Sequence, residues 1–403
     1  MLTERLEFVA ERDSETWAAV PASPAVFLLR GGEQHSEPYI SKTANLRRRL
    51  HRLLGPVEGR TRKLNLRDRI RSIEYTLTGS DFESGFLLYK LLRATFPKTY
   101  GDRLRFRFAP LVKMHLENEY PRASITTQLG RLNRRSLYYG PFLSRAAAEK
   151  FMNDSLDFFK LRRCVDDLDP DPKFPGCIYS EMKMCLAPCF KGCSDEEYKQ
   201  EVGRVRNYFD SGGESLVREL SEQREAASAN LDFENAAALH TRIEKLKPVL
   251  GQLPEIVHRL DQMHAVMIQP WAAAESVVFY RIEVGCISGP IAFPIPSTEP
   301  AKSQSMESRV QEALDSFPPA RAKSALETME HLALFKRWYY RSRRVGEVFF
   351  ADDRGVLPLR RLVRGISRVY RGEHPETTVI EPSFPQGKQV KDEERHEKNK
   401  DER

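Results

Sequence analysis

The chain has 403 residues, of which 40% are hydrophobic and 30% are charged, and its formal net charge is +7. This length exceeds one ordinary domain and predicts three or four units. No run of about 18 apolar residues occurs, which excludes a membrane-spanning helix, and the charged start "MLTERLEFVAERD" lacks the apolar core of a secretion signal. We therefore expect a cytoplasmic α+β multidomain protein.

Residues 1–105 predict a small α/β domain. Leucines at helical spacing, with arginines between them, predict a helix over 43–54. A second helix is expected over 81–96, with Asp81 as its N-cap. Three stretches are typical of strands, the first two forming a hairpin: "AVFLLRGG" (25–32), "EPYIS" (37–41) and "SIEYTLTG" (72–79).

Basic residues concentrate in one window of this domain. The window from Arg47 to Arg71 contains ten lysines and arginines but only two acidic residues, Glu58 and Asp68. Its net charge is therefore +8, and that of the rest of the chain is −1. A local basic field on a near-neutral body is typical of polyanion binding, although a solvated helix face gives the same pattern. We expect the following residues to contact DNA: Lys42, Arg47, Arg48, Arg49, Arg52, Arg60, Arg62 and Lys63.

Residues 106–212 predict a cysteine-rich domain. Strands are expected in "RLRFRFAPLV" and "RASITTQ", a loop in "SLYYGPFLS", and a helix from Ala146 to about Leu161. A capped helix is expected in "SDEEYKQEVGRVRNYFDSGG" (194–213). Five of the six cysteines of the chain lie within thirty residues of this domain, and in a reducing compartment such crowding favours metal ligation over disulfides.

Four of these cysteines have the spacing Cys164-x12-Cys177-x7-Cys185-x3-Cys189. Four thiolates can hold either a zinc ion or an iron–sulfur cluster. Structural zinc sites usually contain two pairs of cysteines that are each separated by two to four residues, whereas this segment contains one such pair. The wide gaps favour the larger cluster, with zinc as the alternative.

Residues 213–252 predict a helical hairpin. The apolar positions of its first helix are Leu216, Leu220 and Ala227, and those of its second helix are Ala236, Leu239, Ile243, Leu246 and Leu250. Two short helices bury little surface on their own. The pair should therefore dock elsewhere in the chain or on a partner.

Residues 253–372 predict a small α/β region, with three strands between 264 and 296 and helices from Ser305 to Arg344. Its stretch "FKRWYYRSRR" is compatible with base stacking or with a half-buried helix. Asp352 and Asp353 are typical turn residues. The tail, residues 373–403, is expected to be disordered because of its charge.

The stretch "SLYYGPFLSRAAAEKFMNDSLDFFKLRRC", followed by "CIYSEMKMCLAPC", resembles the UvrC family, the incision subunits of the bacterial UvrABC excinuclease. This resemblance implies a [4Fe–4S] cluster on Cys164, Cys177, Cys185 and Cys189. It leaves Cys193 as an additional thiol.

The stretch "LSEQREAASANLDFENAAALHTRIEKL" resembles the UVR motif of the same family, a helical hairpin that binds UvrB. His240 and Thr241 stand where the family usually has Arg-Asp. The resemblance implies that five residues contact UvrB: Leu231, Phe233, Glu234, Ala236 and Ala237.

The N-terminal domain resembles a GIY-YIG nuclease, in which a carboxylate-bound metal polarises the phosphate and a tyrosine helps to deprotonate water. The resemblance places Tyr39, Lys42 and Arg49 at the second tyrosine, the lysine and the catalytic arginine. Four positions depart from the family site: Phe27 at the first tyrosine, Ser41 at the glycine, Leu88 at the metal-binding glutamate and Tyr100 at the asparagine.

Because leucine cannot bind a metal ion, we expect a remnant active site that grips phosphate without cutting. The nearest carboxylates, Asp81 and Glu83, are expected to cap a helix, and a divalent metal at this site is not expected. The Asp/Asp/His pattern of the second nuclease of the family is not evident after Ile295.

These observations predict a DNA-binding UvrC-like protein of nucleotide excision repair that docks UvrB and lacks GIY-YIG activity. One alternative is an active metal-dependent repair endonuclease that uses relocated carboxylates. The other is a metal-stabilised nucleic-acid-binding module outside repair.

Overall fold

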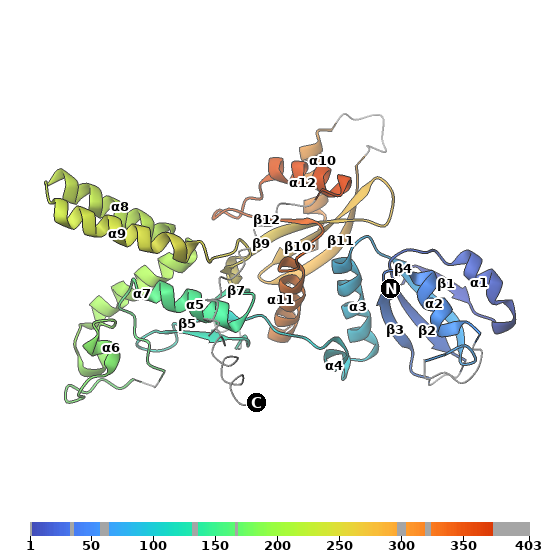
Figure 1. Ribbon diagram of the computed structural model, residues 1–403, viewed down its shortest axis with the longest axis horizontal. Coiled ribbons are helices and arrows are strands. Elements are labelled where there is room, and N and C mark those ends of the chain that lie inside the picture. Colours follow the sequence, from blue (N-terminus) through green and yellow to red (C-terminus); the bar gives the residue numbers. More distant parts are fainter. Residues whose placement is uncertain are drawn as a thin grey trace, which may run out of the picture.

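The computed structural model describes residues 2–32, 36–56, 64–130, 136–165, 168–295, 304–318 and 324–373. Within these residues the chain forms three four-stranded antiparallel sheets and a long helical hairpin. Figure 1 shows the N-terminal sheet at one end of the molecule and the hairpin projecting from the other. The expected mixed α/β architecture with a helical hairpin is thus confirmed.

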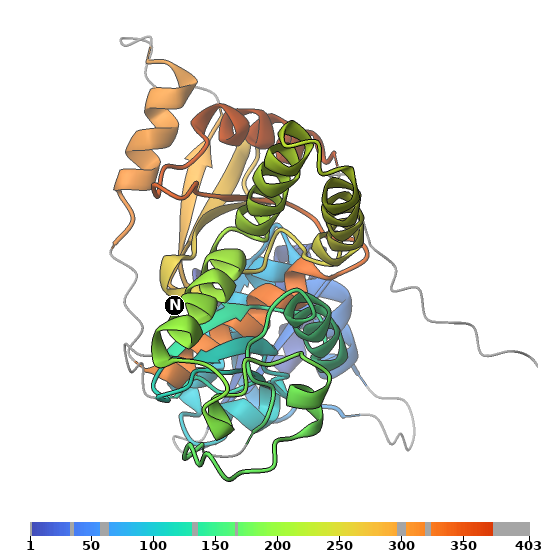
Figure 2. The same cartoon turned by 90° about the vertical axis from the view of Figure 1, so that its left-hand side faces the viewer.

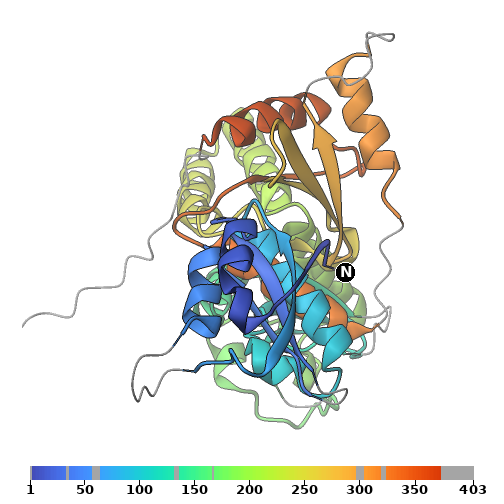
Figure 3. The same ribbon diagram turned by 90° about the vertical axis from the view of Figure 1, so that its right-hand side faces the viewer.

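The N-terminal sheet has the strand order β1-β4-β2-β3. The predicted hairpin is present, with Phe27 paired to Ser41. Helix α2 lies against this sheet (Figure 3). Its leucines are buried in the core, as their spacing predicted, and Asn45 caps the helix. Strand β1 was not predicted, because its sequence "ERLE" is polar and short. The elements are β1 (Glu4–Glu7), a 3-10 turn (Ala10–Arg12), α1 (Asp13–Ala19), β2 (Ala25–Gly31), β3 (Tyr39–Thr43), α2 (Leu46–Leu54) and β4 (Ile70–Leu77).

Helix α3 (Asp81–Thr95), which is followed by α4 (Tyr100–Leu104), lies between the N-terminal and C-terminal sheets (Figure 1). Its N-cap is Ser80 and not the expected Asp81, because the Ser80 hydroxyl accepts a hydrogen bond from the Glu83 N–H at 3.1 Å. One face of α3 lies against β2 and β3. The opposite face places its buried aromatic side chains in the core of the C-terminal sheet.

The C-terminal sheet has the strand order β11-β10-β9-β12 and is covered on both faces. In β9, Ala265 and Met267 face the core shared with α3 and α11, whereas Val266 and Ile268 face α10 and α12. Burial on both sides explains why these strands are almost continuously apolar. The elements are β9 (His264–Pro270), β10 (Ser276–Glu283), β11 (Cys286–Pro294), α10 (Met306–Asp315), α11 (Ala325–Tyr339), β12 (Glu347–Phe350) and α12 (Leu359–Arg371).

The first residues of the aromatic–arginine stretch 335–344 belong to this core. Phe335 and Trp338 are buried on α11, which agrees with the half-buried helix and not with a base-stacking face for these two rings. Asp352 accepts hydrogen bonds from the N–H groups of Arg354 and Val356, as expected for turn chemistry.

The middle sheet has the order β6-β5-β7-β8. The stretch "SLYYGPFLS" was expected to be a loop, but its first half is strand β7, in which Tyr138 and Tyr139 pair with β5. The predicted helix that starts near Ala146 ends earlier than expected, at Leu156. The elements are β5 (Leu111–His115), β6 (Ala123–Thr126), β7 (Ser136–Gly140), α5 (Arg145–Leu156), α6 (Ile178–Glu181), a 3-10 turn (Pro188–Phe190), α7 (Asp195–Asp210), β8 (His258–Arg259) and a second 3-10 turn (Leu260–Gln262).

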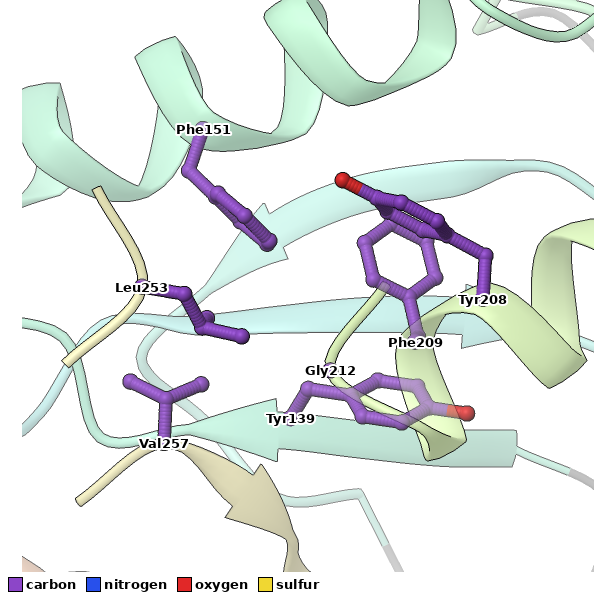
Figure 4. A pocket seen from close by; sticks show the side chains of 7 residues that line it. All are labelled: Tyr139, Phe151, Tyr208, Phe209, Gly212, Leu253 and Val257. Atoms are coloured by element: carbon purple, nitrogen blue, oxygen red, sulfur yellow. The ribbon is translucent and has the colours of Figure 1, made fainter. Parts of the chain in front are cut away.

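The middle core is closely packed. The cavity shown in Figure 4 measures about 10 Å³, which is about the space for one water molecule. Aromatic rings from β7, α5 and α7 surround it, and Tyr139 donates a hydrogen bond to Asp210 at 2.8 Å. This region is therefore a structural core and no ligand site.

The helical hairpin consists of α8 (Glu214–Ala229) and α9 (Phe233–Leu250). Leu216 and Leu220 of α8 join the middle core, and the base of the hairpin contacts α5 and α7 (Figure 2). The base of the hairpin therefore docks within the chain, which was one of the two expected possibilities. No described helix is long and apolar enough to cross a membrane.

Candidate functional site

Two of the three predicted remnant residues meet on the N-terminal sheet. Arg49, on α2, donates a hydrogen bond from Nη2 to the Tyr39 hydroxyl on β3 at 2.8 Å. The Phe27 ring lies 6.1 Å from the Tyr39 ring and is fully buried. The position of the first tyrosine of the family therefore offers no hydroxyl beside this pair.

The third predicted residue, Lys42, is held by a carboxylate. Its ammonium group lies 2.6 Å from Asp81 Oδ1, and Arg341 from the segment after α11 contacts the other Asp81 oxygen. Burial alone would raise the pKa of Asp81, but the hydrogen bonds and charges of the two cations outweigh it and hold that pKa below its ordinary value. The carboxylate is thus ionised and shared between two cations from distant parts of the chain.

Beyond Asp81, the next turn of helix α3 also lies close to Lys42. A side-chain carbon added at Gly85 would lie 3.9 Å from Lys42 Nζ, which identifies the face of α3 nearest to the remnant residues. Leu88 lies three residues later on the same face and is half-buried. Tyr100 instead donates a hydrogen bond to Glu330 at 2.5 Å, which directs its hydroxyl to α11.

The predicted basic surface is divided between exposed and structural residues. Arg47, Arg48 and Arg52 are exposed on α2, and Arg47 also donates a hydrogen bond to the Val20 carbonyl at 2.7 Å. Arg49 is half-buried. Arg67 of the same window bonds to Asp13 and to two backbone carbonyls, so it ties α1 to α2. The predicted DNA contacts Arg60, Arg62 and Lys63 lie outside the described residues.

The four predicted cysteine ligands lie near one another at the edge of the middle core. The pKa of Cys185 is raised to about 11, mainly by burial and also by the charges of Cys164, Cys189 and Cys177. Cys185 also accepts a hydrogen bond from the Ala187 N–H at 3.2 Å. Among the described residues, no three His, Cys, Asp or Glu side chains are arranged to hold a metal ion.

Cys193 has different surroundings. Burial raises its pKa, and the next contributions come from the carboxylates of Glu197 and Asp195. It packs against the middle core, at the start of α7. These surroundings distinguish it from the other four cysteines.

The turn of the helical hairpin exposes the predicted partner residues. Leu231 is 73% exposed and Phe233 is 66% exposed. Glu234 and Ala237 are also exposed, and Ala236 is half-buried. The tip thus presents two large apolar side chains to solvent, next to each other at the turn.

Sequence reasoning missed a buried polar network between α3 and α11. Glu330 is 2% exposed and accepts hydrogen bonds from Tyr89 at 2.8 Å and from Tyr100. Arg93 adds a hydrogen bond to Glu327 at 2.8 Å. These residues lie more than 200 positions apart in the chain, so no local sequence pattern marks the network.

Comparison with known proteins matches two adjacent parts of the chain. Residues 110–208 match the UvrC/Cho excinuclease middle domain, and residues 214–247 match the UvrB/uvrC motif. The chain carries a UvrC-type middle domain and a UVR motif. The predicted resemblance to UvrC is confirmed for these parts, which contain all four cysteines and the hairpin tip.

Several relatives are UvrABC system protein C. The relative from Methanothermobacter thermautotrophicus is 27% identical over 283 residues, covering 70% of this chain and 47% of that protein. The relative from Carboxydothermus hydrogenoformans is 30% identical over 235 residues, covering 58% of this chain and 38% of that protein. The chain thus spans less than half the length of these UvrC proteins. No solved structure matches it.

Proposed function

We propose that this protein is a DNA-binding, UvrC-like component of nucleotide excision repair that docks UvrB through its UVR hairpin. The observation that carries this proposal is the hairpin itself: its base is buried in the UvrC-type middle domain, while Leu231 and Phe233 at its tip are exposed. An exposed aromatic on a rigid scaffold is a typical interface anchor.

The N-terminal sheet would supply the DNA contact. Arg48 and Arg52 are exposed on α2, and Arg49 and Tyr39 form a hydrogen-bonded pair that can hold a phosphate oxygen. Such contacts position a duplex and carry little sequence information. Binding should therefore depend strongly on salt and weakly on sequence.

We infer that this sheet grips phosphate without cutting it. Three features support this inference: buried Phe27 has no hydroxyl, Leu88 gives α3 a hydrocarbon surface, and Lys42 is paired with Asp81. A GIY-YIG site uses a metal-bound carboxylate as its main source of charge stabilisation. Asp81 is the carboxylate that contacts a remnant residue, and it is already shared by two cations.

The four cysteines would hold a [4Fe–4S] cluster, with zinc as the alternative. Their sulfur atoms lie close enough to influence one another's ionisation, since Cys164, Cys189 and Cys177 all raise the pKa of Cys185. All-thiolate sets suit iron–sulfur clusters as well as zinc. Bound to the cysteines, the cluster would cross-link the segment between α5 and α7.

The test of UvrB docking is a binding titration of the full chain with purified UvrB. Phe233→Ala should weaken binding by about 1–3 kcal/mol, as expected for an interface anchor. Val356→Ala, which shortens another exposed apolar side chain, is the matched control and should change nothing. If wild-type protein does not bind UvrB, the repair assignment fails and a binding module outside repair is favoured.

The test of the inactive site is a nicking assay on a damaged duplex preloaded with UvrB, with Mg²⁺ or Mn²⁺. We expect no nick. A nick that is lost in both Arg49→Ala and Asp81→Ala would show an active endonuclease in which Asp81 has taken over the metal.

A further inference from the structure

A cleft of about 340 Å³ opens between α3, β11 and α11. Tyr39, Lys42 and Arg49 do not line it, and neither do Gly85 and Leu88 of α3. Its size is at the lower end of the range of small-molecule sites. Three nitrogen-bearing side chains line it: Lys90, Arg93 and His331.

Lys90 contributes a cation without a carboxylate partner among the described residues. Its ammonium group donates a hydrogen bond to the Gly289 carbonyl at 2.7 Å and lies 4.4 Å from the centre of the Phe86 ring. An ammonium group has three N–H donors. Two of them are therefore available to a ligand while the third fixes the position of the group.

Arg93 contributes further donors one helical turn away. Its bonds to the Tyr89 hydroxyl and to Glu327 both leave from Nη1, at 2.6 Å and 2.8 Å. Within the described residues, Nη2 and Nε have no partner. The bonds at Nη1 hold the guanidinium plane in place, while its other N–H groups remain available.

His331 supplies a donor from the opposite wall. Its Nδ1 accepts a hydrogen bond from the Ile287 N–H at 3.0 Å, so the proton of the neutral ring sits on Nε2. Burial lowers the pKa of His331 to about 4, which keeps the ring neutral. Nε2 has no partner among the described residues. In this tautomer Nε2 is a donor and not a metal ligand.

The oxygen acceptors of the cleft are already engaged. The Glu327 carboxylate is bonded to Arg93, the Gly289 carbonyl to Lys90, and the Tyr89 hydroxyl lies between Arg93 and Glu330. The unused groups are thus N–H donors from three directions. Arg93 Nη1 also lies 3.8 Å from buried Glu330, so the two cations and the two carboxylates of this region balance in charge. Such a set suits a tetrahedral anion that accepts several hydrogen bonds.

We propose that the cleft between α3, β11 and α11 binds the phosphate group of a small phosphorylated molecule. Lys90, Arg93 and His331 donate to the phosphate oxygens. Ala94 and Ile287 form an apolar wall against which the organic part of the ligand packs. The site is independent of the UvrB-docking tip and of the Arg49–Tyr39 pair.

The test is calorimetric titration of the full chain, at low salt, with inorganic phosphate and separately with thymidine 5′-monophosphate. Both should bind, and tighter binding of the nucleotide would identify an organic phosphate as the ligand. Equal affinity would overturn the assignment of an organic phosphate, because the wall formed by Ala94 and Ile287 would then contribute nothing to binding. Lys90→Met keeps the stem over Phe86 and should weaken binding about tenfold, as expected for a lost charged hydrogen bond.

His331→Asn keeps an acceptor near the Ile287 N–H but removes the Nε2 donor, and it should weaken binding by a similar factor. Lys98→Met removes an exposed charge elsewhere and should have no effect. Thermal unfolding checks that each variant is folded. The proposal is overturned if neither probe binds, if Lys90→Met binds like wild type, or if Arg49→Ala abolishes binding.

Discussion

Replacing Asp81 by asparagine tests whether the Asp81 carboxylate weakens DNA binding by occupying the cations Lys42 and Arg341. Asp81 pairs with Lys42 at 2.6 Å and with Arg341, and the side chains of Asp81 and Arg341 are each 52% exposed. Exposed ion pairs contribute about 0.2–1 kcal/mol each. Asp81→Asn should therefore lower the free energy of unfolding by no more than about 1–2 kcal/mol, while releasing both cations.

The released cations should strengthen DNA binding. The substitution also removes a negative charge that repels phosphate by about 1 kcal/mol at 4 Å in water. We expect duplex affinity to rise about fivefold at low salt, which corresponds to about 1 kcal/mol. If Lys42 gains one phosphate contact, the slope of log affinity against log salt should steepen by about 0.9.

Fluorescence anisotropy with a labelled duplex at several salt concentrations measures both quantities. Asp102→Asn, which removes an exposed carboxylate on α4, is the matched control for the change in net charge. Equal gains in both variants would show a non-specific charge effect. Weaker binding in Asp81→Asn would refute the reasoning, because it would mean that Asp81 positions the cations and does not compete for them.

Three further predictions concern folding and the cysteines. Burial raises the pKa of Glu83 to about 7 from 4.5, so the folded state holds this proton more tightly than the unfolded state. The free energy of unfolding should therefore fall by up to about 3 kcal/mol between pH 4.5 and 7. Glu83→Gln should remove that decrease in denaturant titrations, and an unchanged pH profile would contradict it. Tyr100→Phe should cost about 1–3 kcal/mol of unfolding free energy by removing a hydrogen bond to buried Glu330, and a smaller loss would mean that water replaces the hydroxyl. Anaerobically purified protein should be brown with close to four irons per chain; Cys185→Ser should lose iron and Cys193→Ser should keep it, whereas colourless protein with one zinc would exclude the cluster.

The placement of α3 explains why the N-terminal and C-terminal parts of this chain are linked. Phe82, Phe86 and Tyr89 on one face enter the C-terminal core, while Gly85 and Leu88 on the other face the remnant residues. A single helix therefore contributes both to the proposed phosphate grip and to one wall of the proposed anion cleft.

The sequence by itself determined the local elements and the segments that match known families. Leucine spacing predicted α2, strand patterns predicted the β2–β3 hairpin, and the motif residues predicted the UvrC resemblance, because periodicity and short motifs depend on neighbouring residues. Where patterns were weak, prediction failed: the polar strand β1 was missed, and strand β7 was expected to be a loop.

Tertiary structure alone decided which distant residues meet. The Lys42–Asp81–Arg341 group, the bond from Tyr100 to Glu330, and the cleft between α3 and α11 join residues separated by up to 260 positions. No local propensity encodes such contacts, since they arise when buried apolar faces select their partners and polar groups between them must then find hydrogen bonds. The sequence therefore nominated candidate residues, and packing decided which of them are paired with one another.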